Sequence, residues 1–363
     1  MTTLTTNYLT PTGREEAWRF TPLKRLGGMH DGSAVVADRH SLTFVGTKAQ
    51  GVSFELKPAS DAPVLSESDD AIVGRIREAG KDVAVLTISA NTEVADPIIL
   101  GRSQGSLESA EFSRVQINVQ NHARATIIVE NTGDTHLAED IEISVAAGAS
   151  LTLVSLQEWS SKTVHAARQH TVVDRDATFK SVVVTIGGSL VRMLPTVEFA
   201  GPGASCELFG VYFATSGQFF EHRMFVDHKV ANAKSRVNYK GALAGDQAHT
   251  VWIGDVFIRA AAEGTDTYEL NRNLLLSDGA RADSVPNLEI ETGEIVGAGH
   301  ASTTGRFDDE QLFYLMSRGI NLADARRLVV RGFFNEIISE IGQDDIQTRL
   351  MDRIDDELAK AGA

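Results

Sequence analysis

Residues able to do metal chemistry are sparse in this chain, and one histidine stands apart from the others. His300 lies in a glycine-rich stretch, residues 297–306, that ends a long β-type region, and a helical pattern follows directly. Imidazole is a good metal ligand, but ligands normally come in clusters, and a single histidine in a loop is also compatible with a solvated or backbone-bonded ring. The residues alone therefore leave the role of His300 open.

The closest approach to a ligand cluster is His222 and His228, with Glu221 and Asp227 beside them. Residues six apart on one strand share a face but lie about 20 Å apart, too far for one ion unless a turn intervenes. We expect exposed polar strand positions rather than a metal site. The single cysteine, Cys206, excludes an internal disulfide, and its strand-like surroundings indicate a small core residue rather than a reactive thiol.

Paired carboxylates suggest acid–base catalysis, but each pair stands where a helix is expected to begin, and the helix macrodipole explains it without catalysis. Phosphate loops, dinucleotide fingerprints, zinc-protease motifs and nucleophile elbows are all missing from the sequence. The spacing also reveals no concentration of carboxylates of the kind that lines a carbohydrate-cleaving groove. The acidic pairs are Asp69/Asp70, Asp308/Asp309 and Asp344/Asp345.

Composition bounds the class of protein. The 363 residues are 42% hydrophobic and 23% charged, which is typical of a folded soluble chain. A net charge of -15 without a basic run argues against nucleic acid as a partner. Residues 1–6 carry neither a basic nor an apolar leader segment, and no run reaches the roughly 18 apolar residues of a membrane span. We expect a cytoplasmic protein that does not bind membranes.

From Asp82 to Ile290 the chain consists of short segments with period-two alternation, separated by turn residues such as Gly187-Gly188 and Gly201-Pro202-Gly203. The candidates are a sandwich, a propeller and a parallel β-helix, and no propeller repeat of about 40 residues is visible. The β-helix is favoured because stacked coils tolerate unequal loop lengths. The clearest alternations are Val115/Ile117/Val119, Ile141/Ile143/Val145, Leu151/Leu153, Val182/Val184/Ile186 and Val256/Ile258.

Helical patterns flank this region. Residues 14–20 and 67–80 predict a short helix and a capped surface helix within a small mixed α/β region. At the other end we predict helices over 308–317, 321–341 and 344–360, with caps at Asp308 or Asp309 and a stop at Gly319. The division expected is 1–80, 81–305 and 306–363.

The middle one of these three helices has more apolar residues than one face holds. We expect this helix and the last one to pack within the chain rather than serve only as an interface. The predicted stripe is Ala325, Leu328, Val329, Phe333, Ile337 and Ile341, widened by Val330, Phe334 and Ile338.

Several motifs occur in a fixed order and together resemble the SufB/SufD family of iron–sulfur cluster assembly proteins. The opening Glu16-Ala17-Trp18-Arg19-Phe20-Thr21-Pro22-Leu23 resembles the SufD branch. The others are Tyr239-Lys240-Gly241, Gly254-Asp255-Val256-Phe257-Ile258, Asn271-Arg272-Asn273-Leu274-Leu275-Leu276-Ser277, Pro286-x-Leu-Glu-Ile290, His300-x-x-Thr-Thr-Gly305 and Asp309-Glu310-Gln311-Leu312-Phe313-Tyr314-x-x-x-Arg318-Gly319.

The resemblance implies a mainly β protein, with a right-handed parallel β-helix between an N-terminal region and a C-terminal helical domain. It implies a non-catalytic scaffold that forms a heterodimer with a SufB-like subunit and docks a SufC-like ATPase through its C-terminal helices. An iron–sulfur cluster would be held transiently and shared with the partner, with none bound permanently by the isolated chain. Whether the isolated chain forms a homodimer stays open.

Within that resemblance, His300 corresponds to the SufD histidine and is the expected metal and cluster ligand. Ala280 and Ala298 stand where family members carry cysteines, so this chain supplies no thiolate there. One non-thiolate ligand suits a site from which a cluster must leave. Asp309 or Glu310 is a candidate nearby carboxylate, although helix capping explains both. The alternatives are a β-helix carbohydrate-active enzyme and a purely structural β-solenoid.

Overall fold

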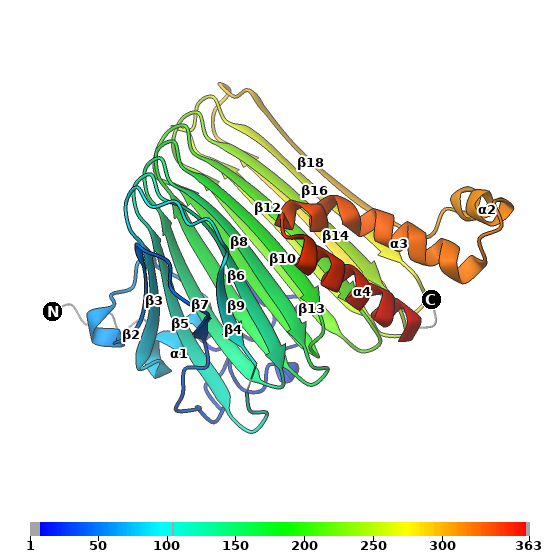
Figure 1. Ribbon diagram of the computed structural model, residues 1–363, viewed down its shortest axis with the longest axis horizontal. Helices are drawn as coiled ribbons and strands as arrows, with labels where there is room; N and C mark the ends of the chain where they lie inside the picture. Colours follow the sequence, from blue (N-terminus) through cyan, green and yellow to red (C-terminus); the bar gives the residue numbers. More distant parts are fainter. Residues whose placement is uncertain (1–7, 104, 361–363) are drawn as a thin grey trace.

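The computed structural model describes residues 8–103 and 105–360, so residues 1–6, on which the expected lack of a leader rests, lie outside it. Within these ranges, β3 to β18 alternate between two sheets, and each turn of the chain adds one strand to each sheet. Sixteen strands therefore make eight turns (Figure 1). The predicted parallel β-helix is confirmed.

All ladders from β3 to β18 are parallel, whereas the short first strands β1 (Thr43–Val45) and β2 (Val52–Pro58) pair antiparallel with β4 and β3. The solenoid strands are β3 (Asp82–Ile88), β4 (Ile98–Arg102), β5 (Ala110–Val119), β6 (Arg124–Gly133), β7 (His136–Val145), β8 (Ser150–Trp159), β9 (Val164–Val173), β10 (Thr178–Ile186), β11 (Leu190–Phe199), β12 (Ser205–Ala214), β13 (Phe219–His228), β14 (Lys234–Leu243), β15 (His249–Ile258), β16 (Asp266–Leu275), β17 (Arg281–Ile290) and β18 (Gly297–Gly305).

The turns are unequal in length. Ala110 pairs with His136, 26 residues further on, whereas His249 pairs with Arg281, 32 residues further on. Each coil keeps strands of similar length and absorbs the difference in its loops. This is why the sequence shows strands but no fixed repeat.

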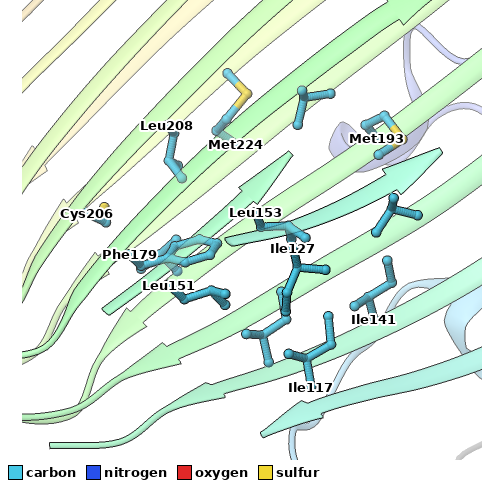
Figure 2. Close-up of a cluster of buried hydrophobic side chains, with 14 of the residues drawn as sticks. Ile117, Ile127, Ile141, Leu151, Leu153, Phe179, Met193, Cys206, Leu208 and Met224 are labelled. Carbon is cyan, nitrogen blue, oxygen red and sulfur yellow. The ribbon is translucent and has the colours of Figure 1, made fainter. Parts of the chain in front are cut away.

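Inward-facing side chains fill the space between the two sheets. Figure 2 shows side chains from successive strands, among them Ile117, Ile141, Leu151 and Leu208, gathered in one buried cluster. The alternation predicted for residues 115–119, 141–145 and 151–153 therefore marks the interior. Stacked strands of this kind bury apolar area continuously along the axis, which is the main stabilising term.

One corner of each coil is a left-handed residue, and these corners stack. The N–H of His122 donates to the carbonyl of Ala147 in the next coil at 3.1 Å, and the N–H of Gly148 donates to Arg175 at 2.9 Å. Only glycine, asparagine, aspartate and similar residues adopt this conformation readily. The positions with positive φ along this corner are Asn91, His122, Gly148, Asp176, Gly203, Asn232 and Gly264.

The N-terminal region lies along the outer face of the sheet that contains β5 and β7. The predicted surface helix is α1 (Ala71–Ala79), and its N-cap Asp70 accepts hydrogen bonds from Ile72 and Val73. Its inner face is buried against the sheet. The helix expected over 14–20 is only a 3-10 turn, η1 (Glu16–Trp18), because Pro22 follows so soon. Two further 3-10 turns are η2 (Leu23–Arg25) and η3 (Ala59–Asp61).

The C-terminal helices are α2 (Asp309–Ser317), α3 (Leu322–Ile338) and α4 (Asp344–Lys360), with the 3-10 turn η4 (Ser339–Ile341) between α3 and α4. Asp308, one of the two residues predicted as caps, caps α2, and Asn321, the first residue of the range predicted for the middle helix, caps α3. Gly319 adopts the left-handed conformation after α2. In Figure 1, α3 and α4 lie across the outer face of the sheet formed by β8, β10, β12 and β14.

The buried face of α3 differs from the predicted stripe. Leu328 is exposed, whereas the residues treated as a widening of the stripe, Val330, Phe334 and Ile338, are buried. These three residues of α3 share a buried cluster with Val182, Val184 and Ile186 of β10. The alternating side chains at 182, 184 and 186 therefore point outward, beneath the helices, and not into the solenoid. Lys240 on β14 donates to Glu336 on α3 at 2.6 Å. The expected packing within the chain is confirmed.

No helix in the described part of the chain is both long enough and apolar enough to cross a membrane.

Candidate functional site

The last turn of the solenoid is open. Among the described residues, β17 pairs only with β15, and β18 pairs only with β16, so each sheet ends in an unpaired edge. Residues on both strands are half-buried or exposed, unlike those of the preceding turns. An uncovered strand edge offers free backbone donors and acceptors to another chain. Pro286 removes one donor from the β17 edge.

His300 is part of this open turn. The sequence suggested a glycine-rich loop, but residues 297–305 form β18, the final strand, so the loop interpretation is wrong. His300 stands beside Glu269 of β16 in the parallel register. Its Nδ1 lies 3.7 Å from Oε1 of Glu269, and its side chain is 43% exposed. The imidazole is thus accessible from outside while one nitrogen faces the solenoid interior.

Glu269 lies behind His300, and its side chain is only 1% exposed. Neither of its carboxyl oxygens accepts a hydrogen bond from a residue that the structure describes. Burial, and secondarily the negative charge of Asp255, raise the pKa of Glu269 to about 8. A carboxyl in this state is costly to bury and strongly favours a nearby cation.

A polar network ties β17 and β18 to the interior. The hydroxyl of Ser302 donates to that of Ser284 at 2.8 Å, and Ser284 donates to Asn271 Oδ1 at 2.8 Å. Asn271 in turn donates to the hydroxyl of Tyr212 at 2.9 Å. These bonds hold the two last strands across the open end of the solenoid. The motif around Asn271 was visible in the sequence, but its contacts lie in other turns and were not predicted.

The two alanines that the resemblance places at cysteine positions are both at this end of the molecule. Ala298 lies on β18 two residues before His300, and Ala280 lies just before β17. Both pack, partly buried, against the solenoid core. Neither side chain can ligate a metal.

His222 and His228 do not form a metal site. Both are fully buried on β13, so the expectation of exposed strand positions is wrong. Thr185 and Ser235 lie within hydrogen-bond distance of the two rings, at 3.0 and 2.9 Å. Burial lowers the pKa of His222 to about 3 and that of His228 to about 4, which keeps both rings neutral.

The other candidates have structural roles. Cys206 is buried in β12, and burial raises the pKa of its thiol, which makes it unreactive. Asp308 accepts hydrogen bonds from the N–H groups of Glu310 and Gln311. Asp309 and Glu310 stand in the first turn of α2, where the helix dipole favours acidic residues.

A concentration of charge that the sequence did not reveal lies on the outer face of β7 and β9. Asp140 accepts a hydrogen bond from Arg168 at 2.8 Å, and Glu142 accepts from the N–H and hydroxyl of Ser66 at 3.0 and 2.8 Å. Arg77 of α1 also lies 3.5 Å from Asp140. These carboxylates are buried beneath the N-terminal region, so they do not line a groove for a carbohydrate.

Comparison with known proteins gives the family. A profile described as "SUF system FeS cluster assembly, SufBD core domain" matches residues 101–333. An iron–sulfur cluster assembly SufBD family protein of Mycobacterium tuberculosis is 46% identical over 360 residues, covering 96% of this chain and 89% of the relative.

Two further relatives extend this similarity. A SufBD family protein of Mycobacterium leprae is 45% identical over 356 residues, covering 96% of this chain and 90% of its own length. The iron–sulfur cluster assembly protein SufD of Escherichia coli is 25% identical over 380 residues, covering 96% of this chain and 89% of its own length. The matched region holds the open last turn, His300, α2 and most of α3, and the chain belongs to the SufBD family of iron–sulfur cluster assembly proteins.

Proposed function

We propose that this chain is a SufD-type, non-catalytic scaffold subunit that contributes His300 to an iron–sulfur assembly site shared with a second subunit. The observation that carries the proposal is the accessible imidazole on the last strand of the solenoid, whose outer edge is unpaired. The cluster is the cargo of this site and is held transiently. A single imidazole among thiolates binds iron less firmly than a full thiolate set, which suits release.

A SufB-like homologue is the proposed partner at the open end. The unpaired edges of β17 and β18 offer backbone groups with which a similar solenoid end can pair. Because Ala280 and Ala298 supply no sulfur, the thiolates would come from that partner. Pairing of two copies of this chain through the same edge is the corresponding homodimer.

A SufC-like ATPase is the proposed partner of the C-terminal helices. Phe313 on α2 is 73% exposed, and Tyr314, Met316, Leu322 and Leu328 are also exposed on α2 and α3. Several large apolar side chains exposed on two neighbouring helices are typical of a protein contact. Because α3 is anchored on β12 and β14 of the solenoid by Phe334 and Lys240, motion of the ATPase would be transmitted to the solenoid.

We further propose that the chain divides functionally into residues 1–80, 81–305 and 306–363, and that it acts in the cytoplasm. The first part covers the outer face of the solenoid, the second provides the assembly site, and the third receives the ATPase. The continuous ladder from β3 to β18 and the start of α2 at Asp309 support this division.

The test is reconstitution of cluster assembly with the cysteine-bearing homologue and the ATPase. We expect His300→Ala to reduce cluster formation strongly, because the partner's thiolates lose the ligand that completes the site. The matched control is His122→Asn, which replaces an exposed corner histidine by a residue that tolerates its left-handed backbone. Undiminished cluster formation with His300→Ala would remove His300 from the mechanism.

A further inference from the structure

The distance between the Glu269 carboxyl and the His300 ring bears on whether the two groups form a hydrogen bond or bind a common ion. The two side chains come from neighbouring parallel strands in direct register, and His300 Nδ1 lies 3.7 Å from Glu269 Oε1. A hydrogen bond between them would need about 2.7–3.2 Å. Two ligands of a tetrahedral ion with bonds of about 2.1 Å lie about 3.4 Å apart. The observed distance is closer to a pair of metal ligands than to a hydrogen-bonded pair.

The surroundings of Glu269 leave its carboxyl without another partner. Both oxygens are buried and accept no hydrogen bond within the described residues. A buried carboxylate without donors is expensive unless a cation meets it. The only cationic or imidazole group recorded within 4 Å of Glu269 in the described chain is His300.

The opposite sheet makes room for this carboxyl. Gly254 lies on β15, and a Cβ there would collide with Oε2 of Glu269 and with the ring of Trp252. The glycine thus allows Glu269 to stay beneath β18 instead of being pushed outward. This supports a specific position for the carboxyl beside His300, because the space for it is provided by a residue without a side chain.

We propose that Glu269 and His300 together bind one divalent first-row metal ion, of the class of Fe²⁺, through Glu269 Oε1 and His300 Nδ1. This inference rests on the role proposed above for His300 and adds a second ligand from the same chain. Mixed oxygen and nitrogen donors suit Fe²⁺, Co²⁺ and Mn²⁺ better than Cu⁺. The site would receive iron before or during cluster assembly.

The pair is an incomplete site by itself. Within the described residues no group of three or more histidine, cysteine, aspartate or glutamate side chains is placed to hold a metal. The outer side of His300 is accessible, so water fills the remaining positions in the isolated chain and a docked partner can replace it. This site therefore differs from one built with Asp309 or Glu310, which stand at the start of α2.

The experiment uses the purified full chain, freed of metal, and Co²⁺ as a spectroscopic probe for Fe²⁺. Co²⁺ binding is followed by its visible absorption and by calorimetry for wild type, Glu269→Gln and His300→Ala. We expect each variant to weaken Co²⁺ binding at least about 10-fold, since even outer partners of a ligand contribute that much. The matched control is His249→Ala, because Nε2 of His249 is already 2.7 Å from Asp283.

Equal Co²⁺ affinity of wild type and Glu269→Gln, or no Co²⁺ binding by wild type, would overturn the inference. Should Glu269→Gln not fold, hyperfine-shifted NMR signals of wild type with Co²⁺ decide, since they must include one imidazole and one glutamate side chain. The outcome is separable from the proposed function. Loss of assembly with His300→Ala alongside unchanged Co²⁺ binding by Glu269→Gln would refute the two-ligand site and leave the scaffold role intact.

Discussion

At the level of single residues, the environment of the Glu269 carboxyl changes its pKa and so its protonation state. It is buried next to Trp252 and Gly254, and the charge of Asp255 acts on it. Its pKa is raised to about 8 from an ordinary value of 4.5. The metal-free chain therefore keeps this group protonated at neutral pH, whereas a bound cation would favour the carboxylate.

This environment predicts a pH-dependent stability. Between pH 4.5 and about 8 the folded chain holds a proton on Glu269 that the unfolded chain has lost. The free energy of unfolding must then fall as pH rises through that window and stay lower above it. Glu269→Gln removes this contribution, so relative to the variant, wild type should lose about 4 kcal/mol between pH 4.5 and pH 9.

Urea unfolding with a metal chelator present measures this difference. The control is Glu207→Gln, a more exposed carboxylate on β12. Parallel stability curves for wild type and Glu269→Gln would show that the carboxyl is not held as described.

The sequence led to His300 through the family resemblance, but it did not lead to Glu269. The two residues are 31 positions apart, one turn of the solenoid, and the turns vary from 26 to 32 residues. Without the register there was no way to tell which earlier carboxyl lies beside the histidine. Asp309 and Glu310 were considered because they are near in sequence, and the structure gives them a place in the first turn of α2 instead.

At the level of elements, glycines in the loops allow the backbones of successive coils to approach each other closely. Gly187, between β10 and β11, has φ +117°, and a Cβ there would collide with the backbone of Trp159 in the preceding coil. Gly217 occupies the corresponding loop between β12 and β13, with φ +73° and no heavy atom within 4 Å of an added Cβ. Both positions impose a left-handed backbone, but only Gly187 also lies against the backbone of another coil. Comparing the two glycines therefore distinguishes the cost of backbone strain from the cost of a steric clash.

We expect Gly187→Ala to cost about 3 kcal/mol or more, because the backbone of Trp159 cannot yield as a side chain could. Gly217→Ala should cost about 1 kcal/mol, the strain of a left-handed alanine alone. Thermal and urea unfolding of both variants check this. Equal destabilisation by the two substitutions would mean that the coils can move apart at this corner.

Short sequence patterns predicted where helices and strands occur, but not which face of each is buried. The helix starts were predicted to within a residue or two: the caps Asp70 and Asp308 each belong to an acidic pair expected at a helix start, and Asn321 begins the range predicted for the middle helix, because capping depends on a few adjacent residues. The buried face of α3 was not, because Leu328 and Val330 are equally apolar and only the position of the sheet decides between them. The alternation at 182–186 was likewise read correctly as a strand, but its covering by α3 and α4 depends on distant residues.

At the level of the whole molecule, the two ends of the solenoid differ in whether other strands cover them. The antiparallel strands β1 and β2 cover its beginning, whereas β17 and β18 leave its last turn open. The C-terminal helices lie on the side of the solenoid, with α2 projecting from it in Figure 1. The two surfaces proposed for partners, the open end and the exposed side of the helices, therefore lie on separate parts of the molecule.

The helical surface gives the last prediction. Phe313→Ser combined with Tyr314→Ser should weaken binding of a SufC-like ATPase at least about 10-fold, because exposed aromatic anchors dominate such contacts. The melting temperature should change little, since both side chains are largely exposed. Calorimetric titration of the ATPase into wild type and variant measures the effect.

The matched control is Leu56→Ser, which changes an exposed apolar residue on β2, at the covered end of the solenoid. It should bind the ATPase as wild type does. Pairing with the cysteine-bearing homologue should survive the α2 substitutions, because that contact uses β17 and β18. If the α2 variant binds the ATPase normally, the exposed aromatic face serves another partner; if it loses both partners, the two surfaces are not independent.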